Sequence, residues 1–217
     1  MKIQLNAAPL LVVLLSGCQG TSTDAKSRGP VDASLGCVSV AACDTNSAAS
    51  DASSDGGGSC TATAEEHEPN SFEHLPDCSP IIYDTNPPSG GNHYGTWAAY
   101  QTYDFPVPPG FLVHEMEHGG VVIWYNCPEG CPGEVAQARA MIDALPDDTA
   151  CDGYQKRVAM TPYPELTTRW AASSWGFTLR SNCLDAAAFT NFYVQHLGHG
   201  RELECSQGAV VQPTTCP

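Results

Sequence analysis

The segment Phe111–Tyr125, which reads FLVHEMEHGGVVIWY, constrains the fold of this chain most. His114 and His118 stand four residues apart, so a single helical turn places both imidazoles on the same face. Two glycines then end the turn, and the β-branched and aromatic run Val121–Tyr125 predicts a buried strand. Two imidazoles that converge beside a buried strand suit a divalent transition metal. The segment therefore predicts a metal site and specifies no reaction.

Hydrophobic periodicity predicts further regular structure after this segment. Apolar spacing indicates helices over residues 134–145 and 184–197. The strand candidates are residues 81–83, 156–160 and 169–180, the last with a kink at Gly176. After an irregular N-terminal half rich in proline and glycine, the order from residue 119 is strand, helix, strand, strand, helix. This order predicts an α/β (α+β) fold in which two helices cover a small sheet.

The N-terminus has the pattern of a targeting segment. Lys2 precedes a short apolar run that ends in Leu-Ser-Gly-Cys at Cys18. This ending resembles the bacterial lipobox, in which the cysteine becomes the lipidated first residue of the mature protein. We expect residues 1–17 to be a lipoprotein signal peptide and Cys18 to carry a lipid that anchors the protein in the cell envelope. Because Gln19 follows the cysteine, where aspartate would mark inner-membrane retention, the outer membrane is favoured.

Composition separates a tether from a folded domain. Residues 18–64 are rich in serine, alanine, aspartate and glycine, so they cannot build a core and predict a flexible tether. We expect one globular domain over residues 65–217. The formal net charge is −15 with only 9 Lys plus Arg, so we expect no nucleic-acid partner.

The cysteines predict a disulfide-stapled domain. Of 11 cysteines, removing Cys18 leaves an even number, which suggests up to five disulfides in an oxidising compartment. An odd number of them precedes residue 64 and an odd number follows it. Full pairing therefore requires at least one bridge between the two parts.

Two histidine motifs resemble those of a known family. The first is Pro-Pro-x-x-Gly-x-His-Tyr, which ends at Tyr94, and the second is Val-His-x-x-Glu-His-Gly, which begins at Val113. Together with Trp175-Gly176 they resemble the bacterial family catalogued as domain of unknown function 3105, over about residues 72–197. Such proteins carry a histidine upstream of the Pro-Pro loop, where His74 lies here. The resemblance implies the fold unit and the histidine set, and it implies no reaction.

The histidine set defines an expected metal site. We expect His114 and His118 to bind one zinc or copper ion, because imidazole suits both metals. Two ligands leave a tetrahedral ion half satisfied, and His93 from the Pro-Pro loop and His74 are expected to supply the rest. Glu117 is expected to accept a ring N–H and so to fix the tautomer of a ligand. This site favours metal binding or handling over catalysis.

Three alternatives stay open. His114-Glu115-x-x-His118 matches the zincin signature, in which Glu115 would be the general base of a zinc-dependent hydrolase, although the following glycines should end a helix that zincins continue. Cys127 and Cys131 resemble the C-x-x-x-C-P copper site of Sco-type proteins, whereas outside the cytoplasm a disulfide is the other reading. In the third alternative the histidines only form hydrogen bonds, and the domain binds a partner without a metal.

Overall fold

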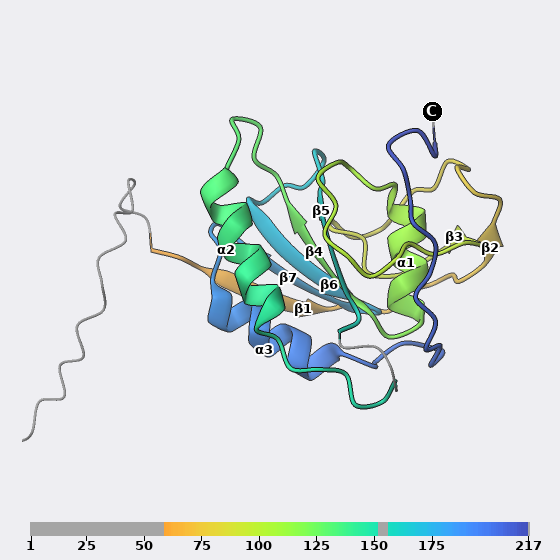
Figure 1. Ribbon diagram of the computed structural model, residues 1–217. Coiled ribbons are helices and arrows are strands. Elements are labelled where there is room, and N and C mark those ends of the chain that lie inside the picture. Colours follow the sequence, from red (N-terminus) through yellow and green to blue (C-terminus); the bar gives the residue numbers. More distant parts are fainter. Residues whose placement is uncertain (1–58, 152–155, 217) are drawn as a thin grey trace, which may run out of the picture. The chain divides into compact units, whose positions relative to one another are not determined.

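The computed structural model describes residues 59–151 and 156–216 (Figure 1). The expected signal peptide, the expected lipidation site Cys18 and most of the expected tether lie outside the described residues. Within the described ranges, no helix combines the length and the apolar character that crossing a bilayer requires. The described part is an α+β fold with a five-stranded sheet, a separate two-stranded sheet and three helices.

The five-stranded sheet has the order β1-β7-β6-β4-β5. Its strands are Ala62–Glu66 (β1), Val121–Tyr125 (β4), Val158–Pro162 (β5), Trp170–Ser174 (β6) and Phe177–Ser181 (β7). Strands β4 and β5 are parallel, and the other neighbouring pairs are antiparallel. A parallel pair needs a crossover, and the chain between β4 and β5 contains a helix. The strand predicted over Val121–Tyr125 is confirmed, and it lies inside the sheet.

The three helices are Pro109–Glu117 (α1), Pro132–Asp143 (α2) and Ala186–His196 (α3). Helices α1 and α2 begin at prolines, which suit the first helical position because its N–H has no intrahelical partner. Helix α3 begins after Asp185, whose side chain accepts a hydrogen bond from the Ala188 N–H at 3.0 Å. The predicted helices over residues 134–145 and 184–197 correspond to α2 and α3.

Alternating side chains of β4 separate two hydrophobic cores. Val122 and Trp124 pack with α1 residues on one face of the sheet. Val121 and Ile123 pack on the opposite face with residues of α2 and α3. Figure 1 shows these two helices on one side of the sheet and α1 on the other. Helix α1, which the sequence predicted only as one turn, is therefore a third covering element.

Two predicted strands differ from the structure. Residues 169–180 form a hairpin of β6 and β7 around Trp175-Gly176, where a single kinked strand was expected. Gly176 has a φ of +81°, a turn conformation that glycine adopts easily, so the glycine marks a reversal of the chain. Residues 81–83 are not a strand. Ile82 is 95% exposed, so its apolar side chain does not contribute to a core.

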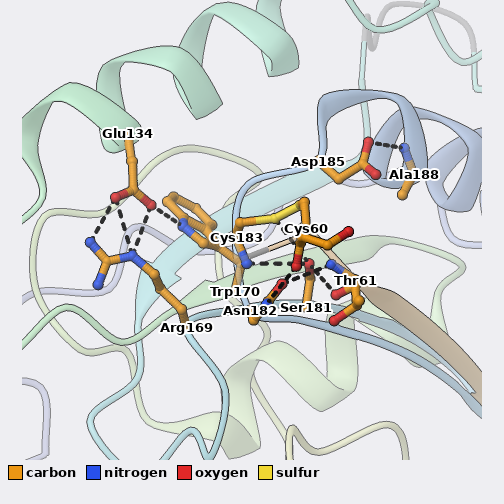
Figure 2. The surroundings of a disulfide bond; sticks show 11 residues. Cys60, Thr61, Glu134, Arg169, Trp170, Ser181, Asn182, Cys183, Asp185 and Ala188 are labelled. Carbon is orange, nitrogen blue, oxygen red and sulfur yellow. Dashed lines mark hydrogen bonds and ion pairs between the residues drawn. A yellow bond between two sulfur atoms is a disulfide. The ribbon is translucent and has the colours of Figure 1, made fainter. Parts of the chain in front are cut away.

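The sheet begins upstream of residue 65, where the domain was expected to start. Strand β1 pairs along its length with β7, and a disulfide between Cys60 and Cys183 fastens its upstream end (Figure 2). Beside that disulfide, the Ser181 hydroxyl donates a hydrogen bond to the Thr61 carbonyl at 2.9 Å. The last residues of the expected tether are therefore part of the folded domain.

Disulfide bonds staple the domain as expected. The described pairs are Cys60–Cys183, Cys78–Cys216, Cys127–Cys131 and Cys151–Cys205. The first of these joins the part before residue 64 to the part after it, as the parity argument requires. Cys37 and Cys43 lie outside the described residues.

Candidate metal centre

A two-stranded ladder brings two of the predicted histidines together. Strands β2 (His74–Leu75) and β3 (His93–Tyr94) are parallel, and their register pairs His74 directly with His93. The backbone of the Pro-Pro loop closes this ladder, because the His93 N–H donates to the Glu73 carbonyl at 3.1 Å. Directly paired residues on one ladder point to the same face. The ladder thus places His74 and His93 side by side, although they are far apart in the sequence.

Helix α1 supplies the other candidate ligands. His114, Glu117 and His118 share one face of this helix because residues three and four apart are neighbours. Helix α1 packs closely on β3 at Gly110, where a Cβ atom would lie 2.6 Å from the Tyr94 ring. Gly119, with a φ of +87°, ends the helix directly after these residues, as the sequence predicted. The helix therefore presents its last turn to the β2–β3 ladder.

Three imidazoles and one carboxylate converge at this contact. His74, His93, His114 and Glu117 each offer one ligand atom, and these atoms all lie within 4.8 Å of one another. The three ring centroids are separated by 4.6 to 4.8 Å. His93, His114 and Glu117 are buried, whereas the side chain of His74 is 52% exposed. We call these four residues the His/Glu cluster.

Backbone carbonyls orient two of the imidazoles. His93 Nδ1 lies 2.8 Å from the Gly91 carbonyl oxygen, and His114 Nδ1 lies 2.7 Å from the Tyr94 carbonyl oxygen. Because a carbonyl only accepts, Nδ1 must carry the proton in both rings. The lone pair of each neutral ring is then on Nε2. This is the arrangement by which proteins prepare histidine for a metal.

The two oxygens of Glu117 have different surroundings. Oε1 accepts a hydrogen bond from Nη1 of Arg201 at 2.8 Å. Oε2 lies 2.9 Å from Nε2 of His93 and 3.4 Å from Nε2 of His74. Oε2 of Glu117 and Nε2 of His93 are both buried, and neither has a hydrogen-bond partner of acceptable geometry among the described residues. Arg201 therefore fixes one oxygen while the other faces the histidines.

The pKa shifts favour the forms that bind a metal. Burial lowers the pKa of His114 to about 4, and burial also lowers the pKa of His93. Burial alone would raise the pKa of Glu117, but the nearby His93, Arg201 and His74 outweigh it, so that pKa lies below its usual value. Neutral imidazoles beside an ionised carboxylate are the states that ligate metals.

The structure places the remaining predicted residues differently. His118 is not a member of the His/Glu cluster, although its ring lies 4.5 Å from that of His114. Glu117, expected to support a ligand, itself contributes an atom to the cluster. Glu115 is completely buried, and both of its oxygens lack a hydrogen-bond partner among the described residues. Burial raises its pKa well above the usual value, and its carboxylate belongs to neither group of described residues that could hold a metal ion.

Cys127 and Cys131 form a disulfide in the turn between β4 and α2. Neither cysteine belongs to a group of described residues that could hold a metal ion. Copper binding of the Sco type needs two reduced thiolates, so this arrangement favours the disulfide alternative.

Sequence reasoning missed Arg201 and Glu202. Both lie in the segment after α3, where the Glu202 N–H donates to the Glu117 carbonyl at 3.0 Å. Neither residue stands in a motif, and no local pattern connects them with α1. Only the folded chain reveals that they border the His/Glu cluster.

The fold and the cluster together define an α+β domain with a histidine-rich candidate metal site. The chain belongs to the family described as "Protein of unknown function (DUF3105)", whose sequence profile matches residues 74–209. This confirms the resemblance found from the two histidine motifs. The match begins at His74 and includes every residue of the His/Glu cluster. The comparison with curated proteins and the comparison with solved structures found no match.

Proposed function

We propose that this protein binds one zinc or copper ion through His74, His93, His114 and Glu117. One observation carries the proposal, namely the convergence of four ligand atoms within 4.8 Å of one another. Around a tetrahedral zinc ion with bonds of about 2.0–2.2 Å, ligand atoms lie roughly 3.4 Å apart. A small contraction of the cluster would therefore complete the coordination.

The ligand types support zinc or copper over harder cations. Imidazole nitrogen suits zinc and copper, whereas magnesium and calcium prefer sites built from oxygen. Three nitrogens and one carboxylate oxygen form a mixed set with a single negative charge. A divalent ion would leave the site with a net positive charge of one, before Arg201 is counted.

The exposure of the ligands supports metal binding or handling. His93, His114 and Glu117 are buried and held by hydrogen bonds to their neighbours. His74 comes from a two-residue strand, and half of its side chain is in contact with solvent. An ion can therefore reach the site and leave it through this one accessible ligand, without unfolding of the core.

The proposal includes a location in the cell envelope. A lipid on Cys18 would anchor the domain to a membrane, with the outer membrane favoured, and residues 19–58 would connect the anchor to the fold. The support is the Leu-Ser-Gly-Cys sequence after an apolar run. A Cys18→Ser protein should move from the membrane fraction to the soluble fraction. An undiminished membrane fraction would overturn the anchor and leave the metal site untouched.

Metal analysis of protein purified without a histidine tag tests the site. We expect one tightly bound equivalent of zinc or copper to remain in the purified wild type, and less than a tenth of an equivalent in His93→Ala and His114→Ala. His67→Ala is the matched control, because His67 lies after β1, outside the His/Glu cluster. It should retain one equivalent. Circular dichroism of each variant distinguishes loss of a ligand from loss of the fold.

Full metal occupancy in a folded His93→Ala, His114→Ala double variant would overturn the proposal. Those histidines would then serve only as hydrogen-bonding residues, as the third alternative from the sequence holds.

A further inference from the structure

His118 is a buried histidine whose hydrogen bonding is incomplete. It is 4% exposed, and its ring is enclosed by His114 and by Trp97, with centroids at 4.5 and 4.7 Å. Nδ1 is buried without a hydrogen-bond partner among the described residues. Nε2 faces Oε2 of Glu202 at 4.0 Å, which is too far for a hydrogen bond. Nε2, which faces the carboxylate, therefore has no hydrogen-bond partner among the described residues and can bind a cation between the ring and Glu202.

Two carboxylates accompany this ring. Glu117, His118 and Glu202 each offer a ligand atom, and these atoms lie within 4.8 Å of one another. Glu117 thus belongs both to this group and to the His/Glu cluster. A carboxylate has about four lone-pair sites on its two oxygens. The hydrogen bond from Arg201 to Oε1 and one metal ion on Oε2 would leave sites free for a second ion.

The backbone brings Glu202 to this place. The Glu202 N–H donates to the Glu117 carbonyl at 3.0 Å, and the Gly198 N–H donates to the Gly119 carbonyl at 2.8 Å. Any Cβ on Gly200 would collide with the Glu117 carbonyl, so the segment can approach α1 this closely only with glycine there. The Glu202 side chain therefore starts from a fixed point at the end of α1, although 59% of it is exposed.

We propose that His118, Glu202 and Glu117 hold a second divalent cation of the zinc class beside the first, with Glu117 shared between the two. This inference rests on the proposed function, because both positions use Glu117. Two-metal sites in proteins hold their ions about 3.5–4 Å apart, which a shared carboxylate can span. One imidazole and two carboxylates suit zinc, with water completing the coordination.

The second position binds more weakly than the first. It offers one nitrogen where the first offers three, and Glu202 is exposed where Glu117 is buried. The two ions should therefore bind in sequence, with the His/Glu cluster filled first.

Zinc titration of the full-length, metal-free protein tests this inference, with bound zinc counted by equilibrium dialysis and elemental analysis. The wild type should bind two equivalents, the second at least tenfold more weakly. Glu202→Gln should bind one equivalent with the affinity of the first site unchanged. Glu204→Gln is the matched control, because Glu204 is an exposed carboxylate near His118 that belongs to neither ligand group. It should retain two equivalents.

The possible outcomes separate this inference from the proposed function. One equivalent in both the wild type and Glu202→Gln, lost in His93→Ala, overturns the second position and leaves the first intact. No zinc in the wild type overturns both. Equal loss in Glu202→Gln and Glu204→Gln overturns the second position as well, because it reports only general attraction by negative charge.

Cobalt supplies a second readout. The visible absorption of bound Co²⁺ depends on its ligands, so two different sites should give two successive spectra in the wild type. His118→Ala and Glu202→Gln should both lack the second spectrum. Because Glu202 is exposed, its substitution should not disturb folding, and the test stands even if His118→Ala fails to fold.

Discussion

Nε2 of His93 lies 2.9 Å from Oε2 of Glu117, and the two buried atoms still do not form a hydrogen bond. The Gly91 carbonyl holds the ring proton on Nδ1, so both facing atoms carry lone pairs. Two lone pairs at this distance repel each other unless a proton or a metal ion lies between them. The contact therefore supports the proposed metal site, which rests on the convergence of the four ligand atoms.

Arg201 should strengthen metal binding without touching the metal. Its guanidinium holds Oε1 of Glu117 at 2.8 Å and leaves Oε2 to the histidines. Loss of a residue that orients a ligand typically costs about 10–100-fold in metal affinity. We therefore expect Arg201→Met to weaken zinc binding by about this factor, measured by competition with a chelator.

Arg180→Met is the control for this prediction. Arg180 pairs with Glu65 across β1 and β7, and its side chain is about as exposed as that of Arg201, at 35% against 37%. Its loss should leave the zinc affinity within about twofold of the wild type. Equal weakening in both arginine variants would show that Arg201 acts through the overall charge and not through Glu117.

Glu115 distinguishes a metal-binding domain from a zincin hydrolase. Its side chain is completely buried and lies outside both groups of potential metal ligands among the described residues. We expect Glu115→Gln to retain the full metal content and to unfold at the same or a higher temperature, because it removes an ionisable group that lacks a partner. A peptidase activity present in the wild type and absent from this variant would instead support the hydrolase alternative.

The sequence predicted the parts of the site that local patterns encode. The spacing of His114 and His118, with glycines after them, predicted the last turn of α1, and the β-branched and aromatic run Val121–Tyr125 predicted the strand β4. His93 was predicted as a ligand from the motif that ends the Pro-Pro loop. The direct pairing of His74 with His93 could not be predicted, because it depends on a ladder of two residues.

The division of roles between the α1 residues also required the structure. Spacing places His114, Glu117 and His118 on one face but does not say which of them meets the ladder. Packing of α1 on β3 brings His114 and Glu117 into the cluster and leaves His118 beside Glu202. Helix periodicity determines which side chains share a face, whereas the ligand set also depends on which other residues the fold places beside that face.

Glu134 should stabilise the fold by accepting hydrogen bonds from Trp170, the first residue of β6, and from Arg169 directly before it. Its carboxylate accepts hydrogen bonds from Arg169 and from the buried Trp170 indole, the latter at 2.7 Å (Figure 2). Glu134→Ala leaves the indole N–H without its partner, so we expect a loss of about 1–3 kcal/mol in the free energy of unfolding. Glu129→Ala is the control, because Glu129 is an exposed partner of Arg169, and it should lower the free energy of unfolding much less than Glu134→Ala does.

The same carboxylate predicts a pH dependence. Hydrogen bonds from Arg169 hold the pKa of Glu134 below its usual value of 4.5. A carboxyl group with a lowered pKa in the folded state stabilises the fold above its unfolded pKa and loses that contribution as the pH falls through the folded value. The stability difference between the wild type and Glu134→Gln should therefore be constant above about pH 5 and shrink below about pH 4.5. Denaturant unfolding at a series of pH values measures it, and a difference that grows on acidification would contradict the assignment.

The disulfides should differ in how much each one stabilises the fold. We also expect that the Cys127–Cys131 bridge binds no metal. The Cys127–Cys131 bridge spans 4 residues, whereas Cys60–Cys183 spans 123. In the chain-entropy account these loops contribute roughly 2 and roughly 5 kcal/mol. Cys127→Ser, Cys131→Ser should therefore lower the melting temperature less than Cys60→Ser, Cys183→Ser, and it should retain the copper content of the wild type. Loss of a copper equivalent in a folded Cys127→Ser, Cys131→Ser protein would instead favour the Sco-type thiolate site, because a disulfide has no thiolate to offer the metal.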